Sequence, residues 1–269
     1  REPIIAGTGG ALREARGLLA GAETIVLLNG DVLFDVDLPA ALAAHRASGA
    51  LASMVLLPMP AGARYASVEV DAGGAVRRIA GSFGPGGEGL TPLHFSGVHV
   101  LSGALPGRVA AAPFERDINR HVYPPLMEGG HVRALQVEGY WNDLGAPDRY
   151  LSAHADLLAG RVPLRRFGGV DPFAGCEERA EGVLVARGAR IHPAATLAGP
   201  VLIGDGVLVE AHARVGPNAV VGARCRVGAG AVVREAVLWE GTDISSGERV
   251  ERAIAAGEVR LPVDPAPLP

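Results

Sequence analysis

Residues 201–228 read VLIGDGVLVEAHARVGPNAVVGARCRVG, and a branched aliphatic residue returns in this stretch at every sixth position. The same spacing runs through ten positions, of which nine are aliphatic: Val185, Ile191, Leu197, Ile203, Val209, Val215, Val221, Val227, Val233 and Trp239. Glycine directly follows several of them, at Gly204, Gly216, Gly222 and Gly228. This pattern predicts a parallel β-helix, in which coils of about 18 residues stack around one continuous core. We expect residues 185 to about 240 to form roughly three coils, with these ten side chains pointing inward.

The repeat resembles the hexapeptide-repeat family of left-handed β-helices. A helix of this kind attached to another domain implies a short set of enzymes, chiefly acyltransferases and sugar nucleotidyltransferases. The first half of the chain has to decide between them. Because a solenoid leaves its end coil open, we also expect a homo-oligomer that associates through this domain.

The composition narrows the class of protein further. The chain has 269 residues, 48% of them hydrophobic, which is enough for two domains with their own cores. All 25 basic residues are arginine, and the net charge of −4 argues against a nucleic-acid partner. The two cysteines, Cys176 and Cys225, are too few for a disulfide framework or a zinc cluster, which suits a reducing cytoplasm. The longest apolar run, residues 51–57, is too short to cross a membrane, so we expect a soluble cytoplasmic protein.

The first half alternates short strands with helices. Strands are expected at residues 24–29, 51–57, 94–101 and 131–137, a hairpin at 65–79, and helices at 11–19, 38–47, 117–127 and 147–158. Residues 24–29 read TIVLLN, and the four central residues are all apolar, which predicts a strand that is buried on both faces as parallel strands are. The fold class is therefore a Rossmann-like mixed α/β sheet at residues 1–159, a linker at 160–182, and a β-helix with a C-terminal tail at 183–269.

Two candidate sites lie in the first part of this sheet. Gly7, Thr8, Gly9 and Gly10 form a turn before a helix, where bare backbone amides can face a nucleotide; the alternative is an ordinary glycine turn. Asn29, Gly30 and Asp31 end the most apolar strand, where open α/β sheets bind ligands. A carboxylate there is a natural magnesium ligand, and the alternative is a solvated aspartate in an Asn-Gly turn.

The third candidate site is Trp141-Asn142-Asp143, which follows the expected strand at 131–137. Asp143 is a candidate second magnesium ligand, facing Asp31 across the sheet. The alternative is a turn carboxylate that stabilises the N-terminus of the next helix. We expect Asp31 and Asp143 to lie close enough to share one ion.

Taken in order, the motifs resemble those of the sugar-1-phosphate nucleotidyltransferases, especially the mannose-1-phosphate guanylyltransferase group. They are GTGGAL at 7–12, LNGD at 28–31, FSGVHVL at 95–101 and GYWNDLGAPDRY at 139–150, followed by the hexapeptide repeats. The resemblance implies that residues 7–10 contact the nucleotide base and that Asp31 and Asp143 hold catalytic Mg²⁺. It also implies that Phe95, Ser96 and Gly97, with Trp141, lie on the sugar side. The partners implied are a nucleoside triphosphate and a sugar 1-phosphate, joined with release of pyrophosphate.

The sequence also departs from this family. Members of the family begin with a strand, a glycine-rich loop that contains an arginine, and a Lys-Pro motif. None of these has a counterpart in this sequence. Residues 81–87 also replace the family's Glu-Lys-Pro sugar-binding motif. We therefore expect the natural protein to carry on the order of 60 to 90 further N-terminal residues. The 269 residues alone are expected to be inactive. The sugar and the base are left undecided.

Two other functions remain open. One is an acyltransferase that works on the β-helix with His192 or His212 as the base, although exposed histidines are ordinary at such positions. The other is a non-catalytic relative that binds a sugar nucleotide to regulate a partner.

Overall fold

The computed structural model describes residues 5–59, 65–109, 116–163 and 171–264. The chain forms two compact units that divide between Gly139 and Tyr140. The sequence predicts a later boundary, at residue 159, because it counts the helix at 147–158 with the sheet. In the structure that helix belongs to the second unit, together with the β-helix. Part of the expected linker, 164–170, lies outside the described residues.

The first unit contains a mixed sheet with the strand order β5-β4-β6-β3-β7, and β1 also pairs with β6. Only β3 and β7 are parallel to each other; the other pairings are antiparallel. The strands are β1 (Thr24–Leu28), β3 (Ala52–Pro58), β4 (Ser67–Val70), β5 (Val76–Ile79), β6 (Thr91–Ser102) and β7 (Val132–Gln136), and the short β2 (Val32–Phe34) follows β1 in the chain. The expected Rossmann-like mixed sheet is confirmed. The hairpin expected at residues 65–79 is formed by β4 and β5.

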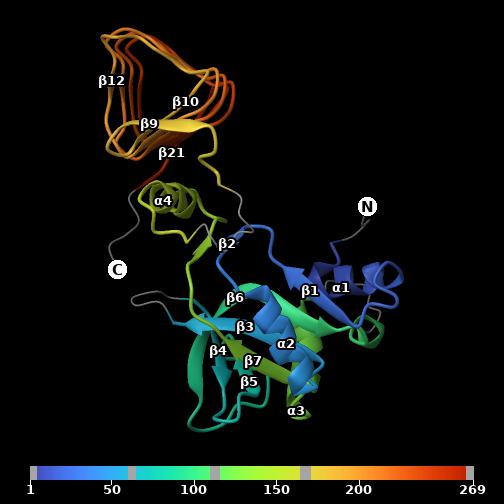
Figure 1. Cartoon of the computed structure of the whole chain (residues 1–269). Helices are drawn as coiled ribbons and strands as arrows, with labels where there is room; N and C mark the ends of the chain where they lie inside the picture. The colour runs from blue at the N-terminus through green and yellow to red at the C-terminus, as the bar shows by residue number, and fades with distance from the viewer. Residues whose placement is uncertain (1–4, 60–64, 110–115, 164–170, 265–269) are drawn as a thin grey trace. The chain divides into compact units, whose positions relative to one another are not determined.

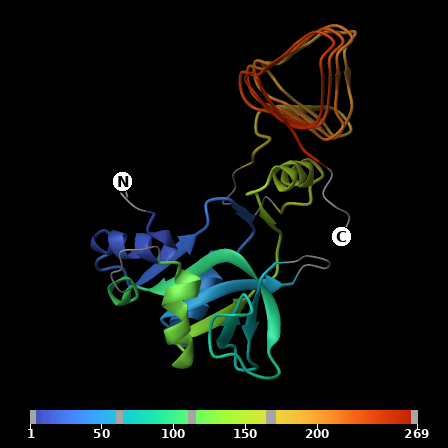
Figure 2. The same cartoon turned by 180° about the vertical axis from the view of Figure 1, so that it is seen from behind.

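Helices cover both faces of this sheet. In Figure 1 α2 (Leu38–Ser48) lies in front of the strands, and in the reverse view of Figure 2 α3 (Tyr123–Glu128) does. The face under α2 buries Ala41, Val55 and Val100. The opposite, larger cluster includes residues of α1 (Gly7–Glu14) and α3. Short 3₁₀ turns at Ala15–Gly17 and Pro106–Arg108, and a π-helical turn at Ile118–Val122, complete this unit.

The ends of α2 show how the sequence sets local structure. The side chain of Asp37 accepts a hydrogen bond from the Ala40 amide at 3.0 Å, and Pro39 occupies the first turn, where its missing N–H costs nothing. Gly49 ends the helix in the left-handed conformation, at φ +64°. These features confirm the predicted helix.

The strand β1 does not have the environment that its composition predicts. It pairs antiparallel with β6, and Leu28 is 56% exposed although it is apolar. The expectation of a parallel strand buried on both faces is therefore wrong for this unit. An all-apolar run indicates burial, but it does not fix the direction of the neighbouring strand.

The second unit contains β8 (Trp141–Asp143), α4 (Pro147–Leu158) and a parallel β-solenoid of about 4 turns. The coils stack their strands on three faces, so the backbone appears triangular in Figure 1, and in the later coils β18 and β20 each run through two of these faces. The coil strands are β10 (Val183–Ala186), β11 (Arg190–Ile191), β12 (Thr196–Leu197), β13 (Val201–Ile203), β14 (Leu208–Val209), β15 (Arg214–Val215), β16 (Ala219–Val221), β17 (Arg226–Val227), β18 (Val232–Leu238), β19 (Asp243–Ile244) and β20 (Arg249–Ala256). The solenoid therefore continues beyond the expected end near residue 240.

Nine of the ten predicted inward residues pack in or against the solenoid core, from Val185 to Val233. Trp239 is the exception: it is 53% exposed, and Leu238, at 1%, takes the inward position. The prediction for Trp239 is therefore wrong by one residue. Cys225 is buried at 1%, as its place in the repeat predicts.

Leu238 replaces Trp239 in the core because the later coils have a shorter corner. Val201 pairs with Ala219, eighteen residues later, whereas Ala219 pairs with Ala236, only seventeen residues later. The same shorter step separates Ala236 from Ala253. Glu235 (φ +48°) and Arg252 (φ +47°) lie at these tighter corners, in the left-handed backbone conformation. The inward series thus continues as Leu238, Ile244, Val250 and Ala255.

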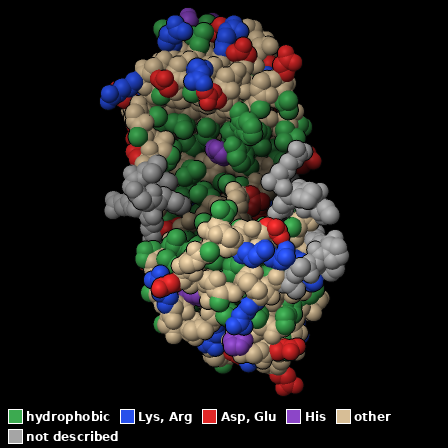
Figure 3. All heavy atoms as spheres, turned by 90° about the vertical axis from the view of Figure 1, so that its right-hand side faces the viewer, with side chains coloured by type: hydrophobic (Ala, Val, Ile, Leu, Met, Phe, Trp, Pro, Cys, Tyr) green, Lys and Arg blue, Asp and Glu red, His purple; other side chains and the backbone are tan. Residues whose placement is uncertain are grey.

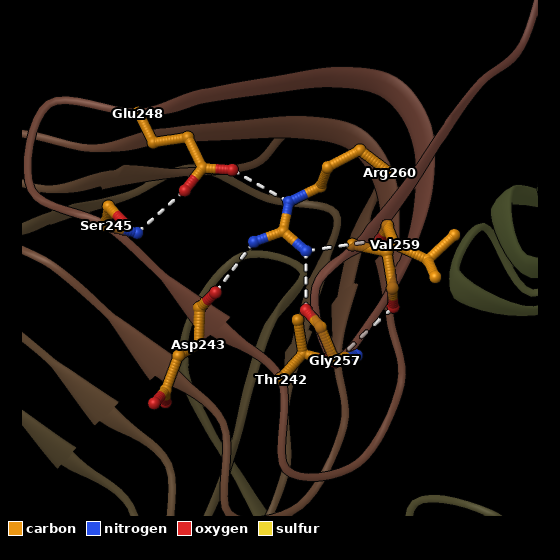
Figure 4. A network of polar contacts seen from close by, with 8 residues as sticks. Thr242, Asp243, Ser245, Glu248, Gly257, Val259 and Arg260 are labelled. Atoms are coloured by element: carbon orange, nitrogen blue, oxygen red, sulfur yellow. Dashed lines mark hydrogen bonds and ion pairs between the residues drawn. The ribbon is translucent and has the colours of Figure 1, made fainter.

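Antiparallel strands flank the coils. The strand β9 (Cys176–Ala180), which the sequence assigns to the linker, pairs with β10. At the other end β21 (Val259–Pro262) folds back on β20. The guanidinium group of Arg260 donates to the carbonyl oxygens of Asp243 and Gly257 at 2.7 and 2.6 Å, and to the Glu248 carboxylate at 2.7 Å (Figure 4). The chain itself therefore covers part of the end coil that the sequence predicts to be open.

The described surface carries charges of both signs. In Figure 3 arginine and acidic side chains lie close to one another at several places on the face in view. Several of them form ion pairs across neighbouring coils, such as Arg226 with Glu210 and Arg234 with Glu251. Among the described residues, no helix combines the length and the apolar character needed to cross a bilayer.

Candidate active site

The first candidate segment, residues 29–31, directly follows β1. The register of β1 on β6 places Leu28 opposite Val98, and the Asn29 amide then donates to the Gly97 carbonyl at 2.9 Å. Asp31 is exposed, and its carboxylate makes no hydrogen bond or ion pair with any part of the chain that the structure describes. This carboxylate is therefore accessible to a ligand.

The second segment, residues 95–97, meets the first through a β-bulge. Leu56 pairs with Phe95 and Val55 pairs with Val98, so Ser96 and Gly97 are extra residues on β6. Bulges re-aim side chains and are frequent beside active sites. The structure thus brings together two of the predicted segments, 29–31 and 95–97, although they are more than sixty residues apart in the chain.

The three residues of this second segment differ in what they expose. Phe95 is half-buried, and its ring lies 4.6 Å from the ring of His99, measured between centroids. Ser96 is completely buried, and its hydroxyl group donates to the Val55 carbonyl at 2.7 Å. Ser96 therefore offers no exposed surface to a sugar in this structure, and its assignment to the sugar side stays a prediction.

The glycine-rich segment 7–10 has a different structure from the one expected. It is not a turn before a helix but the beginning of α1 itself. The amides of Gly9 and Gly10 donate to the Arg116 carbonyl at 2.7 and 3.1 Å, and Thr8 Oγ1 accepts a hydrogen bond from the Ile118 amide at 3.0 Å. These groups hold α1 against the turn at 116–118, so the expected bare amides are absent at Gly9 and Gly10. The assignment of residues 7–10 to the nucleotide stays a prediction.

Gly9 shows why the sequence requires glycine here. A Cβ atom at this position would lie 2.7 Å from the Arg116 carbonyl oxygen and 2.9 Å from a methyl carbon of Val122. Any side chain would separate α1 from the neighbouring turn.

The third segment lies in the second unit, at β8. Asp143 Oδ1 accepts a hydrogen bond from the Gly145 amide at 2.8 Å, and Oδ2 forms an ion pair with Arg149 of α4. This is the turn-stabilising role that the sequence leaves open as the alternative. A carboxylate has further lone pairs, so this role does not prevent metal binding. Because Asp31 and Asp143 belong to different units, their sharing of one ion stays a prediction.

A polar network that the sequence does not reveal surrounds Asp143. The Tyr140 hydroxyl donates to Asp156 at 2.7 Å, and Asn142 donates to Ser152 at 3.2 Å. Burial and the hydrogen bond to Asp156 raise the pKa of Tyr140 to about 12. These contacts tie the segment 140–143 to α4. The spacing of Ser152 and Asp156, four residues apart on one helix face, is a signal for such a network.

The first unit also contains a buried pair of polar side chains. His99 and Tyr123 contact each other behind Phe95, and no short motif marks them. A histidine within the apolar run Val98 to Leu101 is the one signal that could have found it, because a buried imidazole needs a partner.

The histidines of the acyltransferase alternative lie on the solenoid surface. His192 and His212 are both exposed, and Nδ1 of His192 accepts a hydrogen bond from the Ala194 amide. Neither is accompanied by a group of three or more metal-ligating side chains, and no such group occurs among the residues that the structure describes. Their environment is that of ordinary surface histidines.

Two family models match the chain. The nucleotidyl transferase model matches residues 1–81, and the GMPPB C-terminal domain model matches residues 197–262. The first covers two of the candidate segments, 7–10 and 29–31. The second covers most of the solenoid coils.

Curated relatives agree with these models. The mannose-1-phosphate guanylyltransferase of Mycobacterium tuberculosis is 30% identical over 216 residues, which are 76% of this chain and 58% of that protein. The mannose-1-phosphate guanyltransferase beta-B of Xenopus laevis is 27% identical over 160 residues, or 56% of this chain and 41% of that protein. The catalytic subunit beta of the Danio rerio enzyme is 27% identical over 161 residues, with the same shares. The chain thus spans about half the length of these relatives.

Proposed function

We propose that this chain transfers a nucleotidyl group from a nucleoside triphosphate to a sugar 1-phosphate, because it is similar to mannose-1-phosphate guanylyltransferases. The products are a nucleoside diphosphate sugar and pyrophosphate. The names of the relatives favour GTP and mannose 1-phosphate as the substrates. The observation that carries this proposal is the meeting of residues 29–31 and 95–97 at the β1–β6 pairing.

The residues in segments 29–31 and 95–97 have different chemical groups, which suit different parts of the substrates. Asp31 presents a free carboxylate two residues after Asn29, whose amide donates to Gly97 in the bulge that follows Phe95. The half-buried aromatic ring of Phe95 offers an apolar surface for the face of a sugar ring. We assign residues 7–10, Asn29 and Gly30 to the nucleotide, and residues 95–97 with Trp141 to the sugar.

Asp31 and Asp143 fit a magnesium ion by donor type, because Mg²⁺ is bound through oxygen ligands and usually by only one or two carboxylates. The ion would neutralise the charge that spreads over the phosphate oxygens during transfer. The chain itself supplies position: in-line attack by the sugar phosphate needs both reactants held in one orientation. Residues 1–269 contain no lysine, so any cationic contact that this part of the protein makes to the phosphates would come from arginine.

The test is an assay of pyrophosphate release by the protein expressed from its complete gene. Five nucleoside triphosphates are paired with a panel of hexose 1-phosphates, with and without Mg²⁺. We expect the highest activity with GTP and mannose 1-phosphate. Failure to release pyrophosphate from any pair, in a protein that melts cooperatively, would overturn the proposed function.

A further inference from the structure

The bulge at residues 96–97 is unusual because both of its residues are committed to contacts inside the protein. Ser96 is completely buried, and its hydroxyl group donates to Val55 where the pairing of β3 with β6 is interrupted. The same oxygen also accepts a hydrogen bond from the Val98 amide at 3.3 Å. The hydroxyl group therefore holds the bulge closed on both sides.

Gly97 makes the contact with the neighbouring strand. Its φ of +85° is in the region that favours glycine, and its carbonyl oxygen accepts the Asn29 amide at 2.9 Å. A Cβ atom at Gly97 would lie 3.1 Å from both Cβ and Nδ2 of Asn29. The side chain of Asn29 thus packs directly on the bare α-carbon of Gly97.

We propose that Ser96 and Gly97 are positioning residues for the segment 29–31, rather than residues that contact the sugar with their side chains. The bulge fixes Asn29 through one backbone hydrogen bond and one close packing contact, and Asp31 follows two residues later. Ser96 holds the bulge in place with its hydroxyl group, and Gly97 contacts Asn29 directly. This inference rests on the proposed function, in which Asp31 holds the magnesium ion.

The first experiment compares two glycines with similar strain but different surroundings. Gly97→Ala places a methyl group against Asn29. Gly130→Ala introduces alanine at a similar φ of +71°, where no atom lies within 4 Å of the added carbon. Both variants carry the cost of a left-handed alanine, so a difference between them reports the contact with Asn29.

Two measurements are made on both variants and on the parent protein. Hydrogen exchange of the amides at 29–31 reports the positioning itself, with no substrate needed. The Mg²⁺ concentration that gives half-maximal pyrophosphate release reports its effect on the site. We expect Gly97→Ala to accelerate exchange at Asn29 and to raise this Mg²⁺ concentration by about tenfold, the scale seen when a partner of a metal ligand is lost. Gly130→Ala should change neither.

A second pair of variants isolates the Ser96 hydroxyl group. Ser96→Thr keeps this group and Ser96→Val replaces it with a methyl group, so both add similar bulk to the same buried position. We expect Ser96→Val to accelerate exchange at 29–31 relative to Ser96→Thr, which should approach the parent.

The outcomes separate the two proposals. Equal exchange at 29–31 in Gly97→Ala and Gly130→Ala overturns the positioning role, whatever the activity. Accelerated exchange with an unchanged Mg²⁺ requirement also overturns it, because the segment would then move without consequence for the site. If the parent protein releases no pyrophosphate, the proposed function fails, and exchange alone decides whether the bulge positions residues 29–31.

Discussion

The hydroxyl group of Tyr123 lies 2.7 Å from Nδ1 of His99, and both side chains are buried within the first unit. His99 in turn contacts the ring of Phe95. Burial lowers the pKa of His99 to about 3, so the imidazole stays neutral, and it raises the pKa of Tyr123. The ring that faces the proposed sugar side thus rests on a neutral, hydrogen-bonded pair.

This pair predicts a loss of stability in mild acid. In the unfolded chain a histidine has a pKa near 6.5, as against about 3 for folded His99. Between these values the unfolded state binds the extra proton, so the free energy of unfolding falls as the pH falls from about 6.5 towards 3. The contribution is at most about 1.4 kcal/mol per pH unit.

Calorimetric melting at several pH values checks this prediction, with His99→Gln as the comparison. The variant should be less stable than the parent at pH 8 but should lose less stability on acidification. Burial also lowers the pKa of His45 and His154, so the parent's slope has other sources. An identical pH dependence of parent and variant would show that His99 titrates normally.

The register of the later solenoid coils predicts opposite effects for two adjacent residues. Leu238→Asp places a charge in the core and should destabilise the solenoid by several kcal/mol. Trp239→Asp changes an exposed side chain and should cost less than about 1 kcal/mol. Thermal unfolding of both variants is the measurement. The reverse ranking would restore the uninterrupted six-residue repeat.

Arg260 predicts the stability of the solenoid's last coil. Its guanidinium group donates to three carbonyl oxygens and to the Glu248 carboxylate. Burial alone raises the pKa of Glu248, but hydrogen bonds from Arg260 and the Ser245 amide outweigh it, and the pKa is lowered. Arg260→Ala should cost about 1–3 kcal/mol in a denaturation experiment. Arg190→Ala, in which the side chain is exposed, is the matched control and should melt like the parent.

Substitution of Asp143 is expected to lower activity without lowering stability. Asp143→Asn retains an oxygen that can accept from the Gly145 amide but loses the ion pair with Arg149. Because partly exposed ion pairs contribute about 0–1 kcal/mol, the melting temperature should change little. Asp31→Asn should also melt normally. Pyrophosphate release should fall by at least about a hundredfold in both variants. Retained activity in either one would remove that residue from the proposed metal site.

The elements with a complete local signal could be predicted from sequence. Asp37 and Gly49 mark both ends of α2, and the repeat identifies the solenoid through Val233. What the sequence could not show depends on partners that are distant in the chain. The direction of β1 is set by β6, and the contacts of Gly9 and Gly97 are set by Arg116 and Asn29.

The shorter corner at Glu235 has a consequence for how this domain can change length. Each coil takes its register from the coil before it, so one residue removed at a corner shifts the phase of every later coil. Leu238, Ile244 and Val250 each come one place earlier than a strict count of six predicts, yet each remains buried. The core of the solenoid thus keeps its buried residues when this corner is one residue shorter. A deletion within a strand would instead move every later side chain on that face to the opposite side. The triangle can therefore be one residue shorter at this corner and keep its buried core.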